Sequence, residues 1–284
     1  PVLREYILGE AMHALGVPTT RALAAVSTGE DVYRDALKPG AVIARTASSH
    51  IRVGTFQYFA AQGEYEKVKQ LADYTINRHF SELKDSQKPY LELLREVCNR
   101  QALLVSKWMQ VGFVHGVMNT DNMTISGETI DYGPCAFIDH YDPSAVFSSI
   151  DHQGRYAFDN QMPMAQWDLA RLAETLLPLI DENPDESVKL ATEAIREFSE
   201  TYQKHWLKGM CRKIGFSEVL EGDLVLIQQL LKLMQIEKVD FTIMFRALSD
   251  AIISLEKEAV VRVMFNESQD FDAWIELWQQ RAKR

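Results

Sequence analysis

Polar side chains of the kinds that bind metal ions or move protons gather between residues 115 and 133. Five of them fall within 17 positions: His115, Asn119, Asp121, Asn122 and Asp131. Asn122 and Asp131 flank a Ser126-Gly127 turn, so a short strand, a turn and a second short strand would bring an amide oxygen and a carboxylate together. Mg²⁺ prefers such oxygen ligands. The segment therefore predicts a divalent metal site, although turns and caps use the same residue types.

The next segment, residues 135–165, has little periodicity and many turn-forming residues, which predicts a long irregular loop. Loops of this length inside a domain are usually functional. Its histidines and aspartates leave two readings open, a metal site or a solvated, substrate-facing loop, and we favour the second. The residues concerned are Asp139, His140, Asp142, Asp151 and His152.

Two stretches of the polar segment resemble parts of protein kinases. Asp131-Tyr-Gly133 resembles the Asp-Phe-Gly triplet that holds a metal ion, and His115 to Asn122 resembles the catalytic loop, whose Asn holds a second ion. The kinase pattern places its catalytic Asp two residues after the His, where this chain has Val117. The carboxylate nearest to that position belongs to Asp121.

Longer motifs resemble the selenoprotein O family of kinase-like proteins. They are His115-Gly-Val-Met-Asn-Thr-Asp-Asn-Met123, Thr129-Ile-Asp-Tyr-Gly-Pro134, Glu10-Ala-Met-His-Ala-Leu-Gly-Val-Pro-Thr-Thr-Arg-Ala-Leu23, Pro39-Gly-Ala-Val-Ile-Ala-Arg45 with Ile51-Arg52, and Gln166-Trp-Asp-Leu-Ala-Arg-Leu172. The resemblance covers at least residues 1–180. It implies transfer of AMP from ATP, bound in a flipped orientation, to Ser, Thr or Tyr hydroxyls of proteins.

The resemblance also implies roles for single residues. Asp121 matches the proton acceptor, Asn122 and Asp131 match ligands of Mg²⁺ or Mn²⁺, and Arg45 and Arg52 match arginines on the nucleotide phosphates. The glutamate that pairs with a phosphate-binding Lys matches Glu5, although helical geometry also admits Glu10. The family's Gly-rich loop and that Lys precede the position matched by Pro1, so we expect the chain to be a fragment holding half an ATP site and to be inactive alone.

Composition narrows the partners and the compartment. A net charge of −10 disfavours nucleic-acid binding. The sequence contains no run of about 18 apolar residues, so it predicts no membrane-spanning helix. Cys98, Cys135 and Cys211 form no metal-ligand spacing, which favours a reducing compartment, the cytoplasm. The expected partners are ATP and protein substrates.

Periodicity predicts an α+β, mostly helical fold. A helix marked by Leu3 to Leu15 precedes a hairpin of residues 21–26 and 41–46, with turn residues at 27–31. Further helices are marked by apolar residues at positions 65–83, 93–108, 169–180, 188–202, 227–234 and 241–255, the last including Ile252. With the resemblance, this predicts a kinase-like fold, with an incomplete N-lobe at residues 1–60 and a helical C-lobe at 61–284.

Three functions are compared. The favoured one is a metal-dependent protein adenylyltransferase. The others are a nucleotide- or partner-binding module without turnover and a small-molecule kinase of the aminoglycoside or choline kinase type, which Val117 contradicts. The sequence does not distinguish AMP from UMP transfer.

Overall fold

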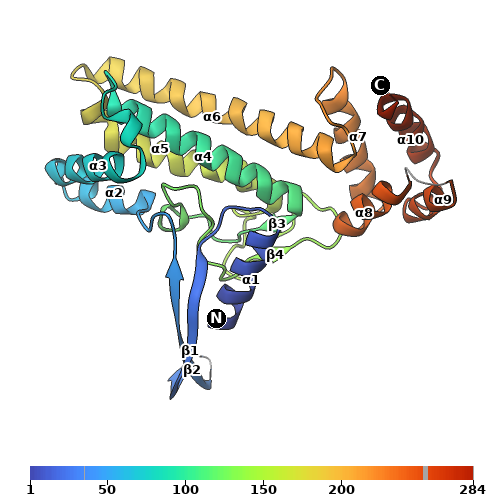
Figure 1. The fold of residues 1–284 in the computed structure, drawn as a ribbon, viewed down its shortest axis with the longest axis horizontal. Helices are drawn as coiled ribbons and strands as arrows, with labels where there is room; N and C mark the ends of the chain where they lie inside the picture. The colour runs from blue at the N-terminus through green and yellow to red at the C-terminus, as the bar shows by residue number, and fades with distance from the viewer. Residues whose placement is uncertain (35, 252–254, 284) are drawn as a thin grey trace.

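The computed structural model describes residues 1–34, 36–251 and 255–283. The protein is α+β and mostly helical, as predicted (Figure 1). The elements are α1 Val2–Ala14, β1 Arg21–Tyr33, β2 Leu37–Thr46, α2 Val53–Ala61, α3 Tyr65–His79, η1 Ser81–Leu83, α4 Pro89–Val111, β3 Phe113–Val114, η2 Thr120–Asn122, β4 Ala136–Phe137, η3 Phe158–Asn160, α5 Gln161–Ile180, α6 Pro184–Lys213, α7 Asp223–Ile236, α8 Phe241–Ala251, α9 Leu255–Met264 and α10 Gln269–Ala282. The kinase-like assignment and the division at residue 60 stay predictions.

Strands β1 and β2 form the predicted hairpin, which extends away from helices α2 to α6 (Figure 1). The prediction of a turn at Ser27–Asp31 is wrong, because these residues lie inside β1 and the chain reverses between Tyr33 and Leu37. The turn-forming residues instead shift the register between Ser27 and Asp31, with Gly29 at a φ of 77°. A bulge uses such residues as readily as a turn does.

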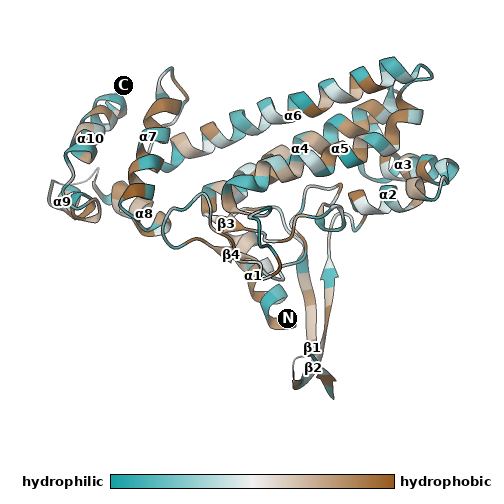
Figure 2. Cartoon of the chain, turned by 180° about the vertical axis from the view of Figure 1, so that it is seen from behind, coloured by the Kyte–Doolittle hydropathy of each residue, from teal (hydrophilic) through white to brown (hydrophobic). Residues whose placement is uncertain are grey.

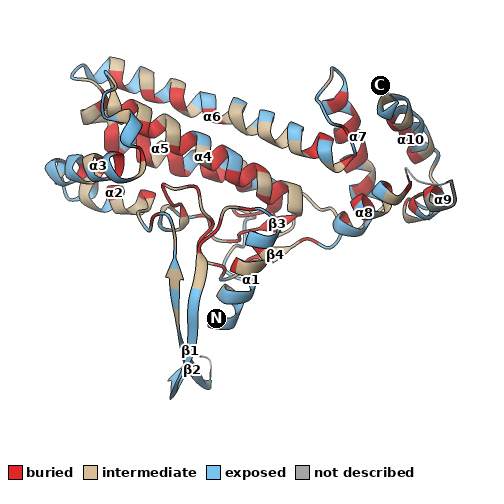
Figure 3. Ribbon diagram, viewed as in Figure 1, coloured by how far each residue is buried: buried red, intermediate tan, exposed pale blue. Residues whose placement is uncertain are grey.

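The outer part of the hairpin is exposed, including apolar side chains such as Leu23, Val26 and Val42 (Figures 2 and 3). Isolated two-stranded ribbons are only marginally stable in water. Helix α1 packs against the hairpin. This contact holds the strand end that carries Arg45 near the polar segment.

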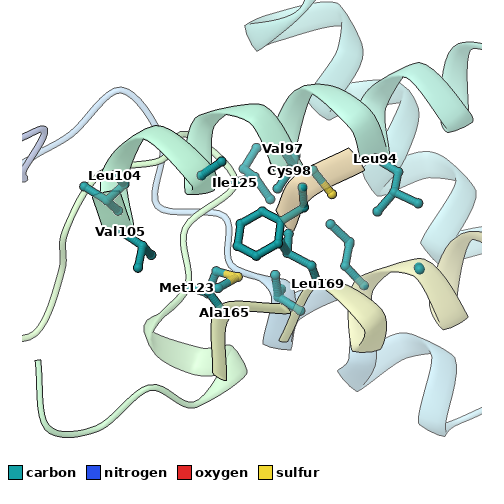
Figure 4. Packing of buried hydrophobic residues seen from close by; sticks show 14 of the residues in the cluster. Leu94, Val97, Cys98, Leu104, Val105, Met123, Ile125, Ala165 and Leu169 are labelled. Atoms are coloured by element: carbon teal, nitrogen blue, oxygen red, sulfur yellow. The ribbon is translucent and has the colours of Figure 1, made fainter. Parts of the chain in front are cut away.

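Helices α4, α5 and α6 pack on one another, and α2 packs on α5. Apolar residues recur along α4 at helical spacing, and Gly112 ends the helix in the left-handed conformation. Figure 4 shows Leu94 and Val97 of α4 against Leu169 of α5, with Met123 and Ile125 of the polar segment in the same cluster. The polar segment is thus anchored by its apolar residues on the helical core.

A second core joins α7, α8 and α10 to the end of α6. Trp274 and Trp278 are buried, and their indole nitrogens donate to the carbonyls of Leu226 and Ile214, both at 2.8 Å. Both indoles belong to this core. Ile252, predicted to continue α8, lies outside the described residues, and α2, α9 and α10 were not predicted. No helix among the described residues is long and apolar enough to cross a membrane.

Candidate functional site

The turn at Ser126-Gly127 is present, but its two legs do not pair with each other. Thr124 closes the turn, because its hydroxyl donates to the carbonyl of Glu128 at 2.8 Å and accepts from the amide of the same residue at 3.0 Å. The leg before the turn pairs with residues 51–53 and the leg after it with residues 18–20.

The predicted short hairpin is therefore wrong in its pairing: β3 pairs with β4, and both legs bond to segments far upstream. The amide of Val53 donates to Met123 O at 3.0 Å, and that of Ile125 donates to Ile51 O at 3.0 Å. Backbone groups occupied in this way cannot pair across the turn. The consequence is that Arg52 lies beside the loop that carries Asn122.

Arg52 brings an uncompensated cation to this loop. Its Nε is buried and has no hydrogen-bond partner among the described residues. A buried guanidinium nitrogen without a partner is costly, and an anion would satisfy it. Arginine offers a rigid fork of donors suited to phosphate oxygens. The structure therefore leaves a place for an anionic ligand at Arg52.

Glu5 links three parts of the site. One carboxylate oxygen accepts from the amide of Tyr132 at 2.6 Å, and the other lies 3.4 Å from a guanidinium nitrogen of Arg45. Glu10 instead makes a two-point ion pair with Arg21, with both distances 2.7 Å. Of the two glutamates left open by the sequence, Glu5 is the one that contacts the Asp131-Tyr-Gly133 triplet.

Arg4, which sequence reasoning missed, binds the backbone of the same triplet and of Cys135. Its Nε donates to Tyr132 O at 2.8 Å, and another guanidinium nitrogen donates to Cys135 O. The adjacent Arg4 and Glu5 thus hold the carbonyl and the amide of Tyr132. The only sequence signal for this role was the pair of opposite charges, Arg4 and Glu5, at the start of a helix. Such a pair does not reveal a contact with a residue 128 positions away in the chain.

His115 holds the loop in place through hydrogen bonds. It is buried, its Nε2 donates to Ile130 O at 2.9 Å, and its Nδ1 faces the amide of Val117 at 3.4 Å. Its own amide donates to Gln161 Oε1 at 2.9 Å. Burial lowers the pKa of His115, so the ring is neutral at pH 7. A neutral ring tied to the residue before Asp131 is a scaffold.

Asn122 and Asp131 both offer free oxygen atoms. The amide nitrogen of Asn122 donates to Val117 O at 3.0 Å, which leaves its Oδ1 available. Asp131 has a φ of 67°, and its carboxylate makes no hydrogen bond or ion pair with any described residue. Left-handed backbone at a residue other than glycine is uncommon and gathers at functional sites.

These donors fit a hard divalent ion. They are oxygens, without the sulfur or imidazole ligands that favour zinc. The described residues contain no group of three or more His, Cys, Asp or Glu side chains able to hold a metal. An ion held by Asn122 and Asp131 would therefore need phosphate oxygens and waters as its other ligands, which is how Mg²⁺ is commonly bound.

Asp121 lies against the first turn of α2. A Cβ built on Gly54 would overlap its Oδ1, so a larger residue at position 54 would displace this carboxylate from its present position. No described residue makes a hydrogen bond or ion pair with Asp121. Asp121 is exposed.

We expect Gly54→Ala to lower the activity of the site tenfold or more without lowering stability. The added methyl group forces the Asp121 carboxylate to move, and a displacement of about 1 Å can cost about 100-fold in rate. In contrast, Ala is favoured over Gly within a helix by roughly 0.5–1 kcal/mol. Transfer rate and urea unfolding, both measured on one preparation of full-length protein that carries the substitution, separate the two effects. A variant that loses both activity and stability would contradict the prediction.

Comparison with known proteins places the chain in a family. A sequence model of the family described as "Protein adenylyltransferase SelO" matches residues 2–284. The chain belongs to the SelO family. It is 58% identical over all its 284 residues to the "Protein nucleotidyltransferase YdiU" of Rhizobium meliloti (strain 1021). It is 56% identical, again over 284 residues, to the protein of that name from Bacillus mycoides (strain KBAB4).

The chain spans between half and two thirds of the length of these SelO relatives. It covers 58% of the R. meliloti protein and 57% of the B. mycoides protein. Membership of the SelO family supports the resemblance drawn from the motifs. The activity of the longer relatives is a proposal for this chain.

Asp168 is a second residue near the SelO-type loop that sequence reasoning did not single out. It lies in α5, inside the stretch 166–172 that carried part of the resemblance. It is fully buried, and neither carboxylate oxygen has a hydrogen-bond partner among the described residues. Burial raises the pKa of Asp168 to about 8, a rise that Arg155 opposes and Asp121 increases. Asp168 is therefore largely protonated at pH 7.

This shift predicts a pH-dependent stability. The native carboxyl of Asp168 keeps its proton up to about pH 8, whereas an unfolded Asp releases it near pH 4. Between these values the unfolded chain binds fewer protons, so the contribution of Asp168 to the unfolding free energy falls as pH rises. We expect Asp168→Asn to flatten the pH dependence of urea unfolding between about pH 4 and pH 8.

The variant Asp139→Asn, at an exposed position, is the matched control. The slope of its unfolding free energy against pH should equal that of the parent protein. Equal slopes for the parent and Asp168→Asn would contradict the buried protonated state.

The aspartates of the long loop have other roles. Asp142 accepts from the amide of Ser144 at 2.8 Å, and Asp151 accepts from the amides of Arg155 and Tyr156 at 2.9 and 2.7 Å. They close turns of the loop. The reading of this loop as a metal site has no support among the described residues.

Proposed function

We propose that the chain carries the nucleotide- and metal-binding groups of a protein adenylyltransferase, which transfers AMP from ATP to Ser, Thr or Tyr hydroxyls. The observation that carries the proposal is the pairing of residues 51–53 with residues 123–125. This pairing sets Arg52, whose buried Nε has no hydrogen-bond partner among the described residues, beside the loop that bears Asp121 and Asn122. Membership of the SelO family supports it.

In the proposed reaction, the hydroxyl oxygen of the acceptor attacks the α-phosphorus of ATP. A new O–P bond forms, the bond from the α-phosphorus to the bridging oxygen breaks, and pyrophosphate leaves. Asp121 accepts the hydroxyl proton. Arg45 and Arg52 stabilise the charge on the departing phosphates. Mg²⁺ or Mn²⁺ bound at Asn122 and Asp131 would supply charge stabilisation for the phosphate oxygens.

Glu5 and His115 position these groups without touching the reacting atoms. Glu5 holds Arg45 on one side and the amide of Tyr132 on the other. His115 holds the carbonyl of Ile130, next to Asp131. Their contacts fix the separation between the proposed phosphate-binding and metal-binding groups.

Two radiolabels test the reaction. The chain and the full-length R. meliloti relative are incubated with acceptor protein and ATP labelled with ³²P at either the α or the γ position. We expect the full-length relative to label protein from the α position alone, with the γ label recovered in pyrophosphate, and the chain by itself to label none. Label in protein from the γ position would assign an ordinary kinase reaction instead. Greater labelling from α-labelled UTP would assign UMP transfer.

A further inference from the structure

The C-terminal halves of α4 and α6 form a hollow at the point where the two helices meet. It has a volume of about 520 Å³ and is lined by Lys107 and Gln110 of α4 and by His205, Lys208, Arg212 and Lys213 of α6. We call it the basic hollow. Residues 107 and 110, and residues 205, 208 and 212, recur at helical spacing, so each helix turns one face toward it.

Gly209 brings the helices together beside the basic hollow. A Cβ at position 209 would overlap the side-chain amide of Gln110. The same amide donates to His205 O at 3.2 Å. The floor is made by two closely packed helices, which suits a preformed ligand site.

The lining carries several positive charges and no negative charge. None of Lys107, Lys208, Arg212 and Lys213 forms an ion pair with a carboxylate among the described residues. The stretches 101–116 and 202–217 contain no Asp or Glu, although the chain has 40 acidic residues and a net charge of −10. Positive side chains are thus concentrated in the basic hollow, although the net charge of the chain is negative.

Structural roles account for only part of this cluster. Lys107 donates to Gly16 O at 2.6 Å, and Lys213 donates to Gln110 O at 2.7 Å while lying 4.2 Å from the centre of the Phe245 ring. Cations also suit the last turn of a helix. Lys208 lies before the last turn of α6 and, like Arg212, makes no hydrogen bond or ion pair with a described residue.

Burial disfavours the charged form of two of these groups. Burial and the charge of Lys208 lower the pKa of His205, and burial lowers the pKa of Lys213 to about 8. A bound anion would favour the charged forms.

We propose that the basic hollow binds a small anion carrying two or more phosphate groups. Several cations call for more than one negative charge, and the arginine fork with separate lysine ammonium groups matches phosphate oxygens. The volume lies within the range of small-molecule sites, about 300–1,000 Å³. His205 carries the one aromatic ring of the described lining, so the recognition is of phosphate groups rather than of a nucleotide base.

None of the lining residues belongs to the site around Asp131, so the proposal does not depend on the proposed function. Pyrophosphate is the probe, and the readouts are calorimetry and the NMR signal of the His205 imidazole. The background with both Arg45→Gln and Arg52→Gln removes the guanidinium groups expected to bind phosphate elsewhere. In it, Lys208→Gln with Arg212→Gln is expected to weaken pyrophosphate binding at least tenfold. The free-state fold is checked by circular dichroism.

Lys204→Gln is the matched control, because Lys204 is an exposed cation of the same helix that lines a different cavity. It should leave the affinity unchanged, and ADP should bind as tightly as pyrophosphate. Unchanged affinity in the double variant, or an equal loss in Lys204→Gln, would overturn the proposal. ADP binding more than tenfold tighter than pyrophosphate would overturn recognition of phosphate alone.

Discussion

Asp121→Asn is expected to lower the rate of AMP transfer by about 10²–10⁴-fold while changing the dissociation constant of ATP less than about twofold. The amide of asparagine cannot accept the hydroxyl proton, whereas it nearly preserves the shape of the carboxylate beside Gly54. A proton acceptor acts on the transition state and contributes little to ground-state binding. Single-turnover transfer from α-labelled ATP, measured with the substitution in a full-length SelO protein, gives the rate, and calorimetry with Mg²⁺ gives the affinity.

The control for Asp121 is Asp139→Asn, which removes one exposed carboxylate from the following loop. It should retain the parent rate. A loss of ATP affinity as large as the loss of rate would move Asp121 from proton transfer to nucleotide or metal binding. An unchanged rate would exclude it from the reaction.

Asp131→Asn is expected to weaken ATP binding in Mg²⁺ by about 100-fold or more and to leave binding in EDTA unchanged. Removing an outer contact of a metal ligand already costs 10–100-fold in many sites. Asparagine is the informative substitution, because it tolerates the φ of 67° at this position and removes only the charge. Alanine would add backbone strain to the loss of the ligand.

The internal control is the difference between Mg²⁺ and EDTA measured for the same preparation. The parent should show a large difference, and Asp131→Asn should show little. Equal affinity of the parent and the variant in Mg²⁺ would refute the role of Asp131 in metal binding. Urea unfolding of Asp131→Asn and Asp131→Ala, compared with the parent, reports the strain separately.

Several local features of the fold could be predicted from sequence. Apolar spacing gave the helices α4, α5 and α6, because a helix that buries one face repeats its apolar residues every three to four positions. Short β-rich runs gave the hairpin. The extent of β1 was missed, because Ser27–Asp31 has the composition of a turn and only the pairing with β2 converts it into a bulge. Helix α2 was missed, since it is short and its start at Arg52 carries no capping signal.

The motifs also predicted which residues gather in the polar segment, and the resemblance assigned it to a family that the comparisons confirm. Sequence reasoning went wrong on how the segment is held. Thr124 and Thr129 each looked like part of a local hairpin, and each is paired with a segment upstream of residue 54. Hydrogen-bond partners so far apart in the chain leave no periodic trace in either segment.

The sequence by itself determined the family, the helical class and the identity of the candidate ligands, since residue types, spacing and motifs are local properties. Only the tertiary structure showed that Glu5 contacts Tyr132, left the Nε of Arg52 buried without a partner, and placed Asp168 near Asp121. It also brought Lys107 of one helix and Lys208 and Arg212 of another to the lining of one hollow. The physical reason is that burial, unsatisfied hydrogen bonds and clustered charge depend on which distant segments meet, and packing of the whole chain decides that.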